Sequence, residues 1–435
     1  MNPPPGKTLR SLIVIGSLAL SLATTPLSGG ESAHKKQPNW PRFRGPEGAG
    51  VSDSTAIPLQ WSHRDYLWRV KLPGHGHSSP VVWGDRLYVT AAEQTDATRL
   101  IRCLDVSDGA TVWQRSFGSP QFDLGNATAY DAATPVVDKE RVYMAWAAPG
   151  ECIIQAIDRT DGRPLWRRDL GPYNSEHGHA TSPIVWRDLL ILMNDQKDDA
   201  SVVALDTRTG ETRWETTRQC EKAAYSTPFI WQPDGAGPQL ITSGWGPGIV
   251  AYDPASGRTL WRLPVFKARC VGSPVAAVGL IFAQSGSGGG GKQFFAVRPG
   301  VPKRNSDAEV AYEVTGSLPY VPTPIAHGEL VFLWSDSGVV QCIDATSGER
   351  LWRERVAGRY FGSPVRLGDR LYCMSREGQM VILAATRDFR ELARIDLGEG
   401  SHSTPAIADG VMYLRTFTHL MAIGDAGVEQ PTTDE

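Results

Sequence analysis

Short apolar runs separated by polar turns recur from about Trp61 to Asp425, and helical periodicity is nearly absent. In VVWGDRLYVT (residues 81–90) and VRLGDRLYCM (residues 365–374), two apolar runs flank a tight Gly-Asp turn. Strands bounded by regularly spaced turn residues are typical of sheets, whereas helices need apolar positions three and four residues apart. The pattern therefore predicts an all-β protein.

One motif returns five times: Asp, three residues, Gly, three residues, Trp. Self-similarity of this kind indicates a repeat architecture. We expect Asp to cap its own turn, Gly to supply the positive φ of a tight hairpin, and Trp to fill the space between neighbouring sheets. The members are Asp105, Gly109 and Trp113; Asp158, Gly162 and Trp166; Asp206, Gly210 and Trp214; Asp253, Gly257 and Trp261; and Asp344, Gly348 and Trp352.

A second signature, Ser or Thr followed by Pro, marks the start of each unit, and successive copies lie about 46 residues apart, a spacing typical of propeller blades. Proline is tolerated at the first residue of a strand because no ladder hydrogen bond is lost there. Four strands per unit predict blades of a β-propeller. The eight prolines are Pro80, Pro135, Pro183, Pro228, Pro274, Pro324, Pro364 and Pro405.

Three units depart from the pattern. In the fifth, Tyr312 replaces Trp, and in the seventh Phe389 and Ala393 stand where Gly and Trp belong. The eighth ends at HLMAIG, residues 419–424, without a fourth strand, whereas LWRVKL at residues 67–72 matches the fourth strands of other units. We therefore expect an all-β, eight-bladed β-propeller of four-stranded antiparallel blades, with a ring closed by the N-terminal strand at Trp68.

The first residues read as an export signal: Lys7 and Arg10 precede the apolar run at residues 11–23, which is too short for a clear membrane span. An uncleaved anchor is the alternative. No cysteine follows this run closely, so lipoprotein anchoring is not expected. The expected organisation is a signal peptide at residues 1–30, an extended leader at 31–58, the propeller at 59–425 and a disordered acidic tail at 426–435.

Composition adds two constraints. Lys and Arg total 44 against 47 Asp and Glu, and the resulting net charge of −3 lacks the basic excess that is typical of nucleic-acid-binding proteins. Export permits disulfides, but the six cysteines include no adjacent pair and no Cys-x-x-Cys. Cys103 and Cys342 read as buried strand residues, and a Cys220–Cys270 pairing is left open because connectivity does not follow from sequence.

With these motifs, the chain resembles the PQQ-like (pyrroloquinoline quinone repeat) β-propeller family. One branch, the quinoprotein alcohol dehydrogenases, holds the quinone with calcium in the central funnel. The other, the propeller subunit of the bacterial outer-membrane protein assembly machinery, has no cofactor and binds partner proteins. The chain lacks the adjacent cysteines of methanol-type dehydrogenases and the lipidation cysteine of the assembly subunit. The stretch WPRFRGPEGAGVS, residues 40–52, is also similar to the leader of secreted PQQ-repeat proteins of unassigned role.

The loops that enter each blade are the candidate binding region, because irregular loops on a rigid scaffold commonly carry function. We expect their polar and aromatic side chains to converge at one funnel mouth. The alternative is that they pack between blades and satisfy loop hydrogen bonds. The candidates are His75, His77, Tyr130, His177, His179, Tyr225, Arg269, Tyr320, Tyr360 and His402.

No metal site is expected, because the two His-x-His pairs belong to the first and third blades and no Asp or Glu with matched spacing joins them. GSGGGGK at residues 286–292 fits a phosphate-binding loop only up to Lys292; Gln293 and a strand follow, so it reads as a flexible loop. No catalytic residue is identified.

These observations predict an exported, periplasmic or extracellular propeller that acts as a non-catalytic scaffold, with no cofactor. The expected partner is a protein or peptide in the cell envelope, with no nucleic acid, no stable membrane anchor and a monomeric state. The alternatives are a quinoprotein dehydrogenase using PQQ with calcium, and a carbohydrate-binding propeller whose aromatic residues stack on sugars.

Overall fold

The computed structural model describes residues 1, 2, 4, 6, 39–54, 57–123, 129–300 and 307–424. The chain divides into residues 1–35 and residues 36–435, and the second unit carries every strand described below. The expected signal peptide and acidic tail lie outside the described residues, apart from four positions near the N-terminus. No helix in the described ranges is long and apolar enough to cross a membrane.

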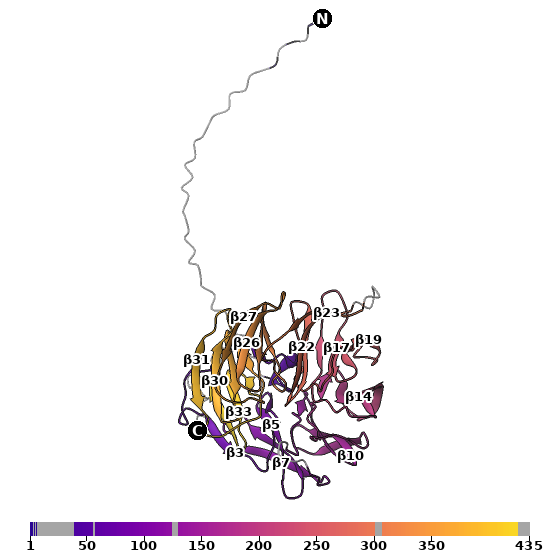
Figure 1. Cartoon of the computed structure of the whole chain (residues 1–435), viewed down its shortest axis with the longest axis vertical. Coiled ribbons are helices and arrows are strands. Elements are labelled where there is room, and N and C mark those ends of the chain that lie inside the picture. The colour runs from indigo at the N-terminus through magenta and orange to yellow at the C-terminus, as the bar shows by residue number, and fades with distance from the viewer. Residues whose placement is uncertain are drawn as a thin grey trace. The chain divides into compact units, whose positions relative to one another are not determined.

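Eight antiparallel sheets follow one another around a ring, and each is a blade (Figure 1). Blade 1 has β4 (Val81–Trp83), β5 (Arg86–Ala92), β6 (Arg99–Asp105) and β7 (Thr111–Phe117). Blade 2 has β8 (Val136–Val137), β9 (Arg141–Ala148), β10 (Glu151–Asp158) and β11 (Pro164–Asp169). Blade 3 has β12 (Ile184–Trp186), β13 (Leu189–Asn194), β14 (Ala200–Asp206) and β15 (Thr212–Arg218). Blade 4 has β16 (Phe229–Trp231), β17 (Gln239–Gly244), β18 (Gly248–Tyr252) and β19 (Thr259–Leu263).

The second half repeats this order. Blade 5 has β20 (Val275–Ala277), β21 (Leu280–Ser287), β22 (Gly290–Arg298) and β23 (Glu309–Val314). Blade 6 has β24 (Ile325–His327), β25 (Leu330–Trp334), β26 (Val339–Asp344) and β27 (Arg350–Arg355). Blade 7 has β28 (Val365–Leu367), β29 (Arg370–Met374), β30 (Gln379–Ala384) and β31 (Glu391–Asp396). Blade 8 has β32 (Ala406–Ala408), β33 (Val411–Arg415), β34 (His419–Gly424) and the N-terminal strand β3 (Trp68–Lys71).

Ring closure by the N-terminal strand is confirmed. β3 pairs antiparallel with β34, with Trp68 opposite Ala422 and Lys71 opposite His419. The strand β3 and the last strand, β34, thus share blade 8, beside blade 1 (Figure 1). The eight-bladed fold predicted from the repeats is therefore the fold of the chain.

The repeated Trp and Gly join neighbouring blades. A Cβ added at Gly162 would lie 2.6 Å from the Trp113 ring, and one at Gly210 would lie 2.6 Å from the Trp166 ring. Each glycine has positive φ, 74° and 73° respectively. The indole of one blade therefore lies flat on the hairpin of the next, where no side chain larger than hydrogen fits.

The indole N–H adds a hydrogen bond across the same interface. Trp113 Nε1 donates to the Arg159 carbonyl at 3.2 Å, and Trp166 Nε1 donates to the Thr207 carbonyl at 3.0 Å. At the ring closure, Trp68 packs on Gly109 and donates to the Val106 carbonyl at 2.8 Å. The closing strand therefore uses the same contact as the blades inside the ring.

Asp caps its turn as expected: Asp105 Oδ1 accepts the Ser107 backbone N–H at 2.9 Å, and the Gly109 N–H returns to the Asp105 carbonyl at 3.0 Å. The N–H of Val106 donates to the Asp85 carbonyl in the turn between β4 and β5. The two tight turns of a blade therefore lie on one face, which leaves the irregular loops on the other.

The degenerate units keep the interface with different residues. Tyr312 packs on Gly348 and donates its hydroxyl to the Ala345 carbonyl, so it replaces Trp. In blade 7, Phe389 replaces Gly and meets Trp352 edge-on, with ring centroids 5.3 Å apart. Ala393 pairs with Ile382, in the register that the motif Trp occupies in other blades.

The first strands are innermost, since β4 contacts both β8 and β32. At their entrances the Ser or Thr before each signature proline forms a hydroxyl belt: Ser79, Thr134, Ser182, Thr227, Ser273, Thr323, Ser363 and Thr404. The N–H of one member donates to the hydroxyl of the next, as from Ser79 to Thr134 at 2.9 Å and from Thr404 to Ser79 at 3.1 Å. Seven such bonds join the belt among the described residues.

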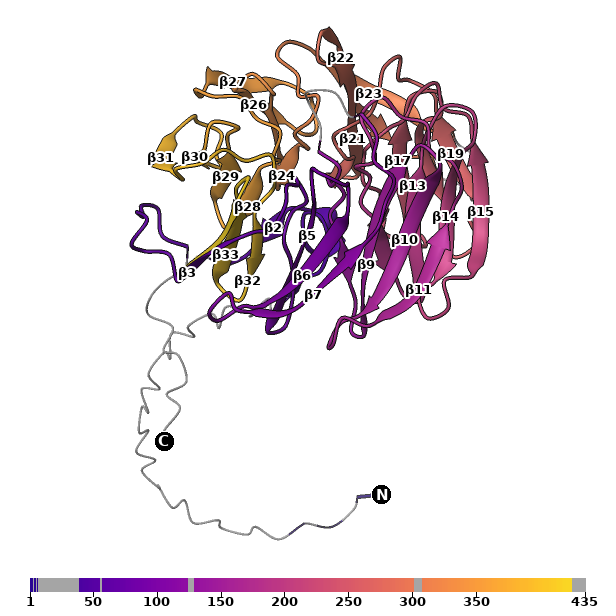
Figure 2. The ribbon, with the colours of Figure 1, turned by 90° about the horizontal axis from the view of Figure 1, so that it is seen from below.

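Residues 39–52, which the sequence places in the extended leader, form a plug across the inside of the ring. β1 (Asn39–Trp40) pairs with β4 of blade 1. β2 (Val51–Ser52) pairs in parallel with β28 of blade 7, and the two lie side by side in Figure 2. A one-turn 3-10 helix, η1 (Pro46–Gly48), lies between them. Because β4 and β28 are first strands, both pairings lie on the channel side of the blades.

Two arginines anchor the plug to the signature prolines. Arg42 Nη2 donates to the Pro228 carbonyl at 2.7 Å, and Arg44 donates to the carbonyls of Pro364 at 2.8 Å and Pro324 at 3.0 Å. Burial lowers the pKa of both guanidinium groups to about 9. One short segment therefore ties blades 4, 6 and 7 together across the channel, in addition to its pairings with blades 1 and 7.

The first prediction concerns the indole-on-glycine contact. Gly210→Ala should lower the free energy of unfolding by about 3 kcal/mol or more, because the new methyl group meets the Trp166 ring and adopts an unfavourable φ. Gly235→Ala is the matched control, since Gly235 also has positive φ but has open space around it. That control should cost about 1–2 kcal/mol. Equal losses in denaturant melts would contradict the contact.

The second prediction concerns the plug. Arg44→Met should lower the free energy of unfolding by about 2–4 kcal/mol, because the Pro324 and Pro364 carbonyls lose their buried donor. Arg64→Met, at an exposed position, should change it by less than about 0.5 kcal/mol. Thermal and urea melts measure both. A near-neutral Arg44→Met variant would show that the plug is not held in solution.

Candidate functional site

A cavity of about 1110 Å³ opens where the entry loops gather. Every blade contributes to its lining, and Phe43 of the plug contributes as well. The hydroxyl belt lies in the same lining, with every member except Ser273 present. We call this cavity the funnel. Since the plug crosses the ring beneath it, a ligand enters and leaves the funnel through one mouth.

The structure brings six of the ten predicted residues into the funnel lining: His77, His177, Tyr225, Arg269, Tyr320 and His402. The other four lie elsewhere. His75 is exposed and forms a β-bridge with Ala92, whereas Tyr130 donates its hydroxyl to the Phe122 carbonyl. His179 is buried against Tyr173, and Tyr360 is buried against Trp334. Entry-loop position alone therefore does not decide which side chains face the funnel.

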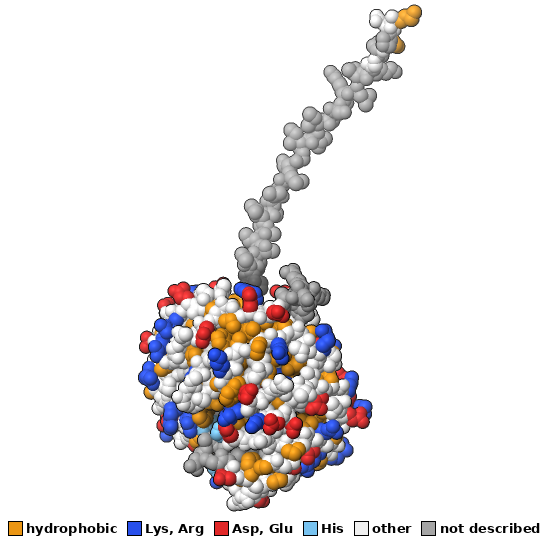
Figure 3. Space-filling model, turned by 45° about the vertical axis from the view of Figure 1, so that its right-hand side comes forward, with side chains coloured by type: hydrophobic (Ala, Val, Ile, Leu, Met, Phe, Trp, Pro, Cys, Tyr) orange, Lys and Arg blue, Asp and Glu red, His pale blue; other side chains and the backbone are white. Residues whose placement is uncertain are grey.

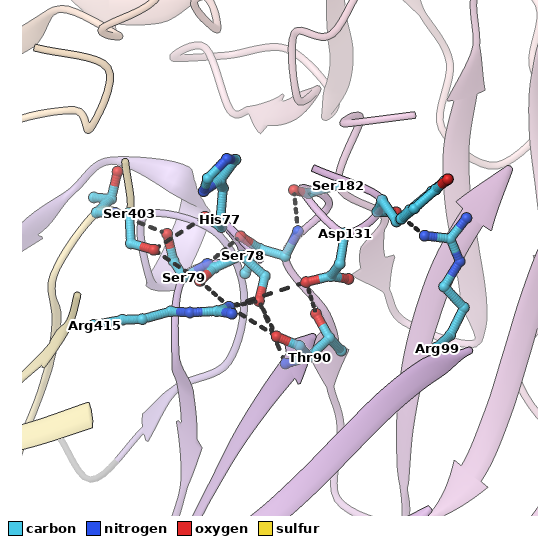
Figure 4. A network of polar contacts seen from close by, with 12 residues as sticks. His77, Ser78, Ser79, Thr90, Arg99, Asp131, Ser182, Ser403 and Arg415 are labelled. Carbon is cyan, nitrogen blue, oxygen red and sulfur yellow. Dashed lines mark hydrogen bonds and ion pairs between the residues drawn. The ribbon is translucent and has the colours of Figure 1, made fainter. Parts of the chain in front are cut away.

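His77 is positioned by a buried polar network that joins blades 8, 1 and 2. The His77 N–H donates to the Asp131 carbonyl at 2.8 Å, and Arg415 Nη1 donates to the Ser78 and Thr90 carbonyls, both at 2.8 Å. Figure 4 shows the His77 ring pointing away from Arg415 and Asp131. The network therefore fixes the backbone and leaves the ring directed outward.

The glycine of the His-Gly-His stretch is required by close packing. A Cβ at Gly76 would lie 2.6 Å from Asp131 Oδ2 and 2.7 Å from Arg415 Nη2. Burial raises the pKa of the Asp131 carboxyl and lowers the pKa of Arg415 to about 10. The His-Gly-His stretch therefore packs at the contact between blades, and its second histidine, His77, lines the funnel.

A ring cluster lines the mouth at blades 7, 8 and 1. The His77 and His402 ring centroids are 4.4 Å apart, and Phe361 and Phe417 lie 4.9 and 5.1 Å from His402. Arg376 Nε donates to His402 Nε2 at 3.0 Å. Burial, and then His402, lower the pKa of His77 to about 3, whereas burial and then Arg376 lower the pKa of His402 to about 4. Both rings are neutral near pH 7.

A charged cluster lines the opposite side of the mouth, at blades 3, 4 and 5. Glu176 accepts from Lys222 Nζ and from Arg269 Nη2, both at 2.7 Å. These two bonds lower the pKa of Glu176 to about 2. The Arg269 guanidinium lies over the Tyr225 ring, 5.4 Å from its centroid, and its Nε donates to the Ala223 carbonyl at 2.9 Å.

The glycine-rich stretch was predicted to be a flexible loop, but residues 286–287 end β21 and residues 290–292 begin β22, so it is the tip of a β-hairpin. This glycine-rich hairpin is a wall of the funnel, since residues 286–292 all line it. Lys292 Nζ lies 2.8 Å from Asp336 Oδ2 of blade 6. Glycines 288–291 have no neighbours that would block a Cβ. The hairpin tip therefore borders open space. It is followed by the strand β22, so no helix N-terminus is present there to bind a phosphate.

Sequence reasoning missed several lining residues, notably Phe43, Glu176, Lys222 and Trp245. Glu176 and Lys222 lie in entry loops, so ranking those loops by charge as well as by aromatic content would have found them. No sequence pattern around Phe43 indicates its position, because the residues near it do not show that the leader folds back into the ring.

The described residues of the lining include no cysteine and one carboxylate. All six cysteines are unpaired, buried and absent from the lining, so a Cys220–Cys270 disulfide is not present. Burial raises the pKa of Cys103 and Cys152 to about 12, far from a reactive thiolate. In the part of the chain that the structure describes, that carboxylate is Glu176, and both of its oxygens accept from cations. Glu176 is therefore engaged in ion pairs and is not placed as a free general base.

The described residues of the funnel do not include a carboxylate cluster that would hold the calcium of a bound quinone. Calcium takes about six to eight oxygen ligands, mostly carboxylates and carbonyls. The described residues include no group of three or more His, Cys, Asp or Glu side chains placed to share a metal ion. Glu176 is directed instead to Lys222 and Arg269. No reaction step through a quinone follows from these residues.

Comparison with known proteins gives one family and one shared fold. A protein-family model described as outer membrane protein assembly factor BamB matches residues 62–230, 198–301 and 336–429. Over 282 residues the chain is 24% identical to the outer membrane protein assembly factor BamB of Burkholderia pseudomallei (strain K96243). That match covers 65% of this chain and 56% of the relative, so the chain spans little more than half of its length.

Two solved structures share the fold. BamB from Moraxella catarrhalis has a TM-score of 0.59 at 16% identity, covering 82% of this chain and 98% of that one. A europium-containing methanol dehydrogenase has a TM-score of 0.66 at 13% identity, covering 87% and 89%. At such identities the likeness concerns the fold, because unrelated functions occupy one fold.

The third prediction concerns the two neutral histidines. A histidine whose folded pKa is depressed favours the folded state above its unfolded pKa of about 6.5 and loses that contribution as the pH falls toward its folded pKa. The double variant His77→Gln, His402→Gln should therefore lose less stability than the wild type between pH 7 and pH 5. Melting temperatures across this range test it, with His75→Gln as the control at an exposed position. Parallel curves for wild type and double variant would contradict it.

Proposed function

We propose a function from the premise that the chain belongs to the family described as outer membrane protein assembly factor BamB. The protein is an exported, non-catalytic β-propeller that binds a protein or peptide partner in the cell envelope. It works as a monomer in the periplasm or outside the cell. The funnel mouth is the binding surface.

The funnel is the observation that carries this proposal. Aromatic rings, histidines, cations and belt hydroxyls face one cavity of about 1110 Å³. Aromatic residues and arginine are enriched in protein interfaces, and a rigid ring presents them without an ordering cost. Apolar and polar contacts from eight blades suit an extended ligand better than a compact reacting group.

Surface charge supports a protein partner over nucleic acid. On the face shown in Figure 3, basic and acidic side chains are interspersed and no extended basic stripe appears. The chain as a whole carries a net charge of −3. A nucleic-acid surface would instead concentrate Lys and Arg on one face.

A quinoprotein dehydrogenase is the second candidate, and two observations favour it. The fold matches a methanol dehydrogenase with a TM-score of 0.66, and the funnel carries Lys222, Lys267, Arg269 and Lys292, which suit an anionic quinone. The calcium ligands are the weak point, because Glu176 is engaged by two cations.

The fourth prediction tests the scaffold function by photo-crosslinking in the native cell envelope. A photoreactive phenylalanine at Phe361, on the funnel mouth, should give one discrete crosslinked protein. The same group at Val112, exposed on the outer strand β7, should not give that species. The crosslinked species should also disappear when Arg269 is changed to Glu. Identical crosslinks from both positions would contradict a funnel-centred interface.

The dehydrogenase alternative is tested on the purified protein. Titration with PQQ and calcium should leave the absorbance spectrum of the quinone unchanged and should yield no alcohol-dependent reduction of an artificial electron acceptor. One bound quinone per chain with dye reduction would replace the scaffold proposal by the enzyme.

A further inference from the structure

The funnel is closed at one end, and this limits what it can hold. The plug pairs with β4 and β28 inside the ring, and its arginines bind the carbonyls of Pro228, Pro324 and Pro364. Phe43, between those arginines, belongs to the funnel lining. A chain therefore cannot thread through the ring, so an extended occupant must enter with a free end or a loop tip.

The charge of the lining is opposite to the charge of the whole protein. Among the described residues, the lining carries Lys222, Lys267, Arg269 and Lys292 with one carboxylate, Glu176, in a chain whose net charge is −3. Lys292 is paired with Asp336 behind the lining, which leaves three cations against Glu176. A cleft that is lined mainly by charges of one sign focuses the electric field and favours ligands of the opposite charge. The funnel is therefore suited to an anionic group.

Arg269 is a preformed anion-binding group. Its side chain is 8% exposed, its Nε is held by the Ala223 carbonyl, and its guanidinium lies over Tyr225. Nη2 points to Glu176, 2.7 Å away, beside Lys222 Nζ. Planar guanidinium groups recognise carboxylates with high geometric specificity. The position of Arg269 is thus set before any ligand arrives.

Glu176, unlike Arg269, is exposed enough for a ligand to displace it. Its side chain is 55% exposed, and the backbone that carries it lies in the entry loop of blade 3, whereas Lys222 and Arg269 belong to the entry loops of blades 4 and 5. Exposed ion pairs contribute little to stability, so replacing one carboxylate by another costs little.

We propose that Lys222 and Arg269 form a receptor for a carboxylate at the end of a peptide ligand, and that Glu176 occupies this receptor as an internal competitor until the ligand displaces it. This inference rests on the proposed function. It specifies which part of the partner enters the funnel: a C-terminal carboxylate or an acidic side chain at a loop tip.

A peptide is the occupant that the surroundings favour. Tyr225 and Tyr320 lie beside Arg269 in the lining. Ser182 and Thr227 of the hydroxyl belt lie in the same lining, and a hydroxyl can donate to or accept from the main-chain amides of a peptide. The backbone of the glycine-rich hairpin borders the same space, and glycines 288–291 have no side chains that would obstruct a bound peptide.

The fifth prediction is measured by isothermal titration calorimetry on purified protein. The probes are acetyl-tetraalanine with a free carboxylate, its C-terminal amide, the amide with Glu at the third position, and an oligogalacturonate. The wild type should bind at least one carboxylate peptide more tightly than the plain amide. Glu176→Gln should bind that peptide about tenfold more tightly, because the competing charge is gone.

Matched variants separate a receptor from a general charge effect. Lys222→Gln, at a half-exposed position, should weaken carboxylate binding by about tenfold and should fold normally. Arg269→Gln should act in the same direction. Glu313→Gln makes the same charge change on the exposed face of β23 and should leave affinity unchanged.

The peptide arms identify the source of the carboxylate: tighter binding of the free acid indicates a chain terminus, and tighter binding of the Glu peptide indicates an acidic loop. Three results would overturn the proposal: equal affinity for amide and carboxylate peptides, no gain in Glu176→Gln, or binding of the oligogalacturonate alone. Funnel crosslinks with any of these results would leave the proposed function standing and remove only the receptor.

Discussion

The contact of an indole with a glycine of the next blade is the constraint on which the ring depends. It needs three things at once: a flat ring on the fourth strand, a hairpin with positive φ, and no side chain at the hairpin glycine. Trp113 on Gly162 and Trp166 on Gly210 show all three, and the indole N–H adds a hydrogen bond to the neighbouring backbone. Because each blade presents the glycine on one side and the indole on the other, the contact propagates until the ring closes through Trp68 on Gly109.

Closure in turn creates the funnel. Once the first strands are held in a ring, the Ser and Thr residues before the signature prolines form a hydroxyl belt, and the proline carbonyls point where Arg42 and Arg44 bind them. The plug thus uses groups that exist only in the closed ring, and it stabilises the closed form through the same groups. The result is a cavity with one mouth, lined by the entry loops, the hydroxyl belt and the β21–β22 hairpin. Such a cavity is suited to recognition by side chains whose positions are fixed in advance.

The sequence predicted the parts of this structure that repeat. The Asp-x3-Gly-x3-Trp spacing predicted the blades, the unmatched strand at Leu67–Leu72 predicted the closure, and Tyr312 was recognised as a substitute for Trp. The parts that do not repeat were not predicted. Arg42 and Pro228 are 186 positions apart, and Glu176 and Arg269 are 93 apart, so no local pattern connects them. His179 and Tyr360 have the same entry-loop position as funnel residues, but their side chains turn into the core, and rotamer direction does not follow from spacing.

The central claim, a closed ring with a plug beneath a single mouth, is tested most directly by amide hydrogen exchange with mass-spectrometric readout. Amides exchange slowly where backbone hydrogen bonds are buried and open rarely. Peptides covering residues 39–52 and β3 should exchange as slowly as those covering β5, and residues 232–236 in the loop after β16 should exchange fast. Fast exchange of residues 39–52 and of β3, with β5 still protected, would show an open ring with an unplugged channel and would contradict the account.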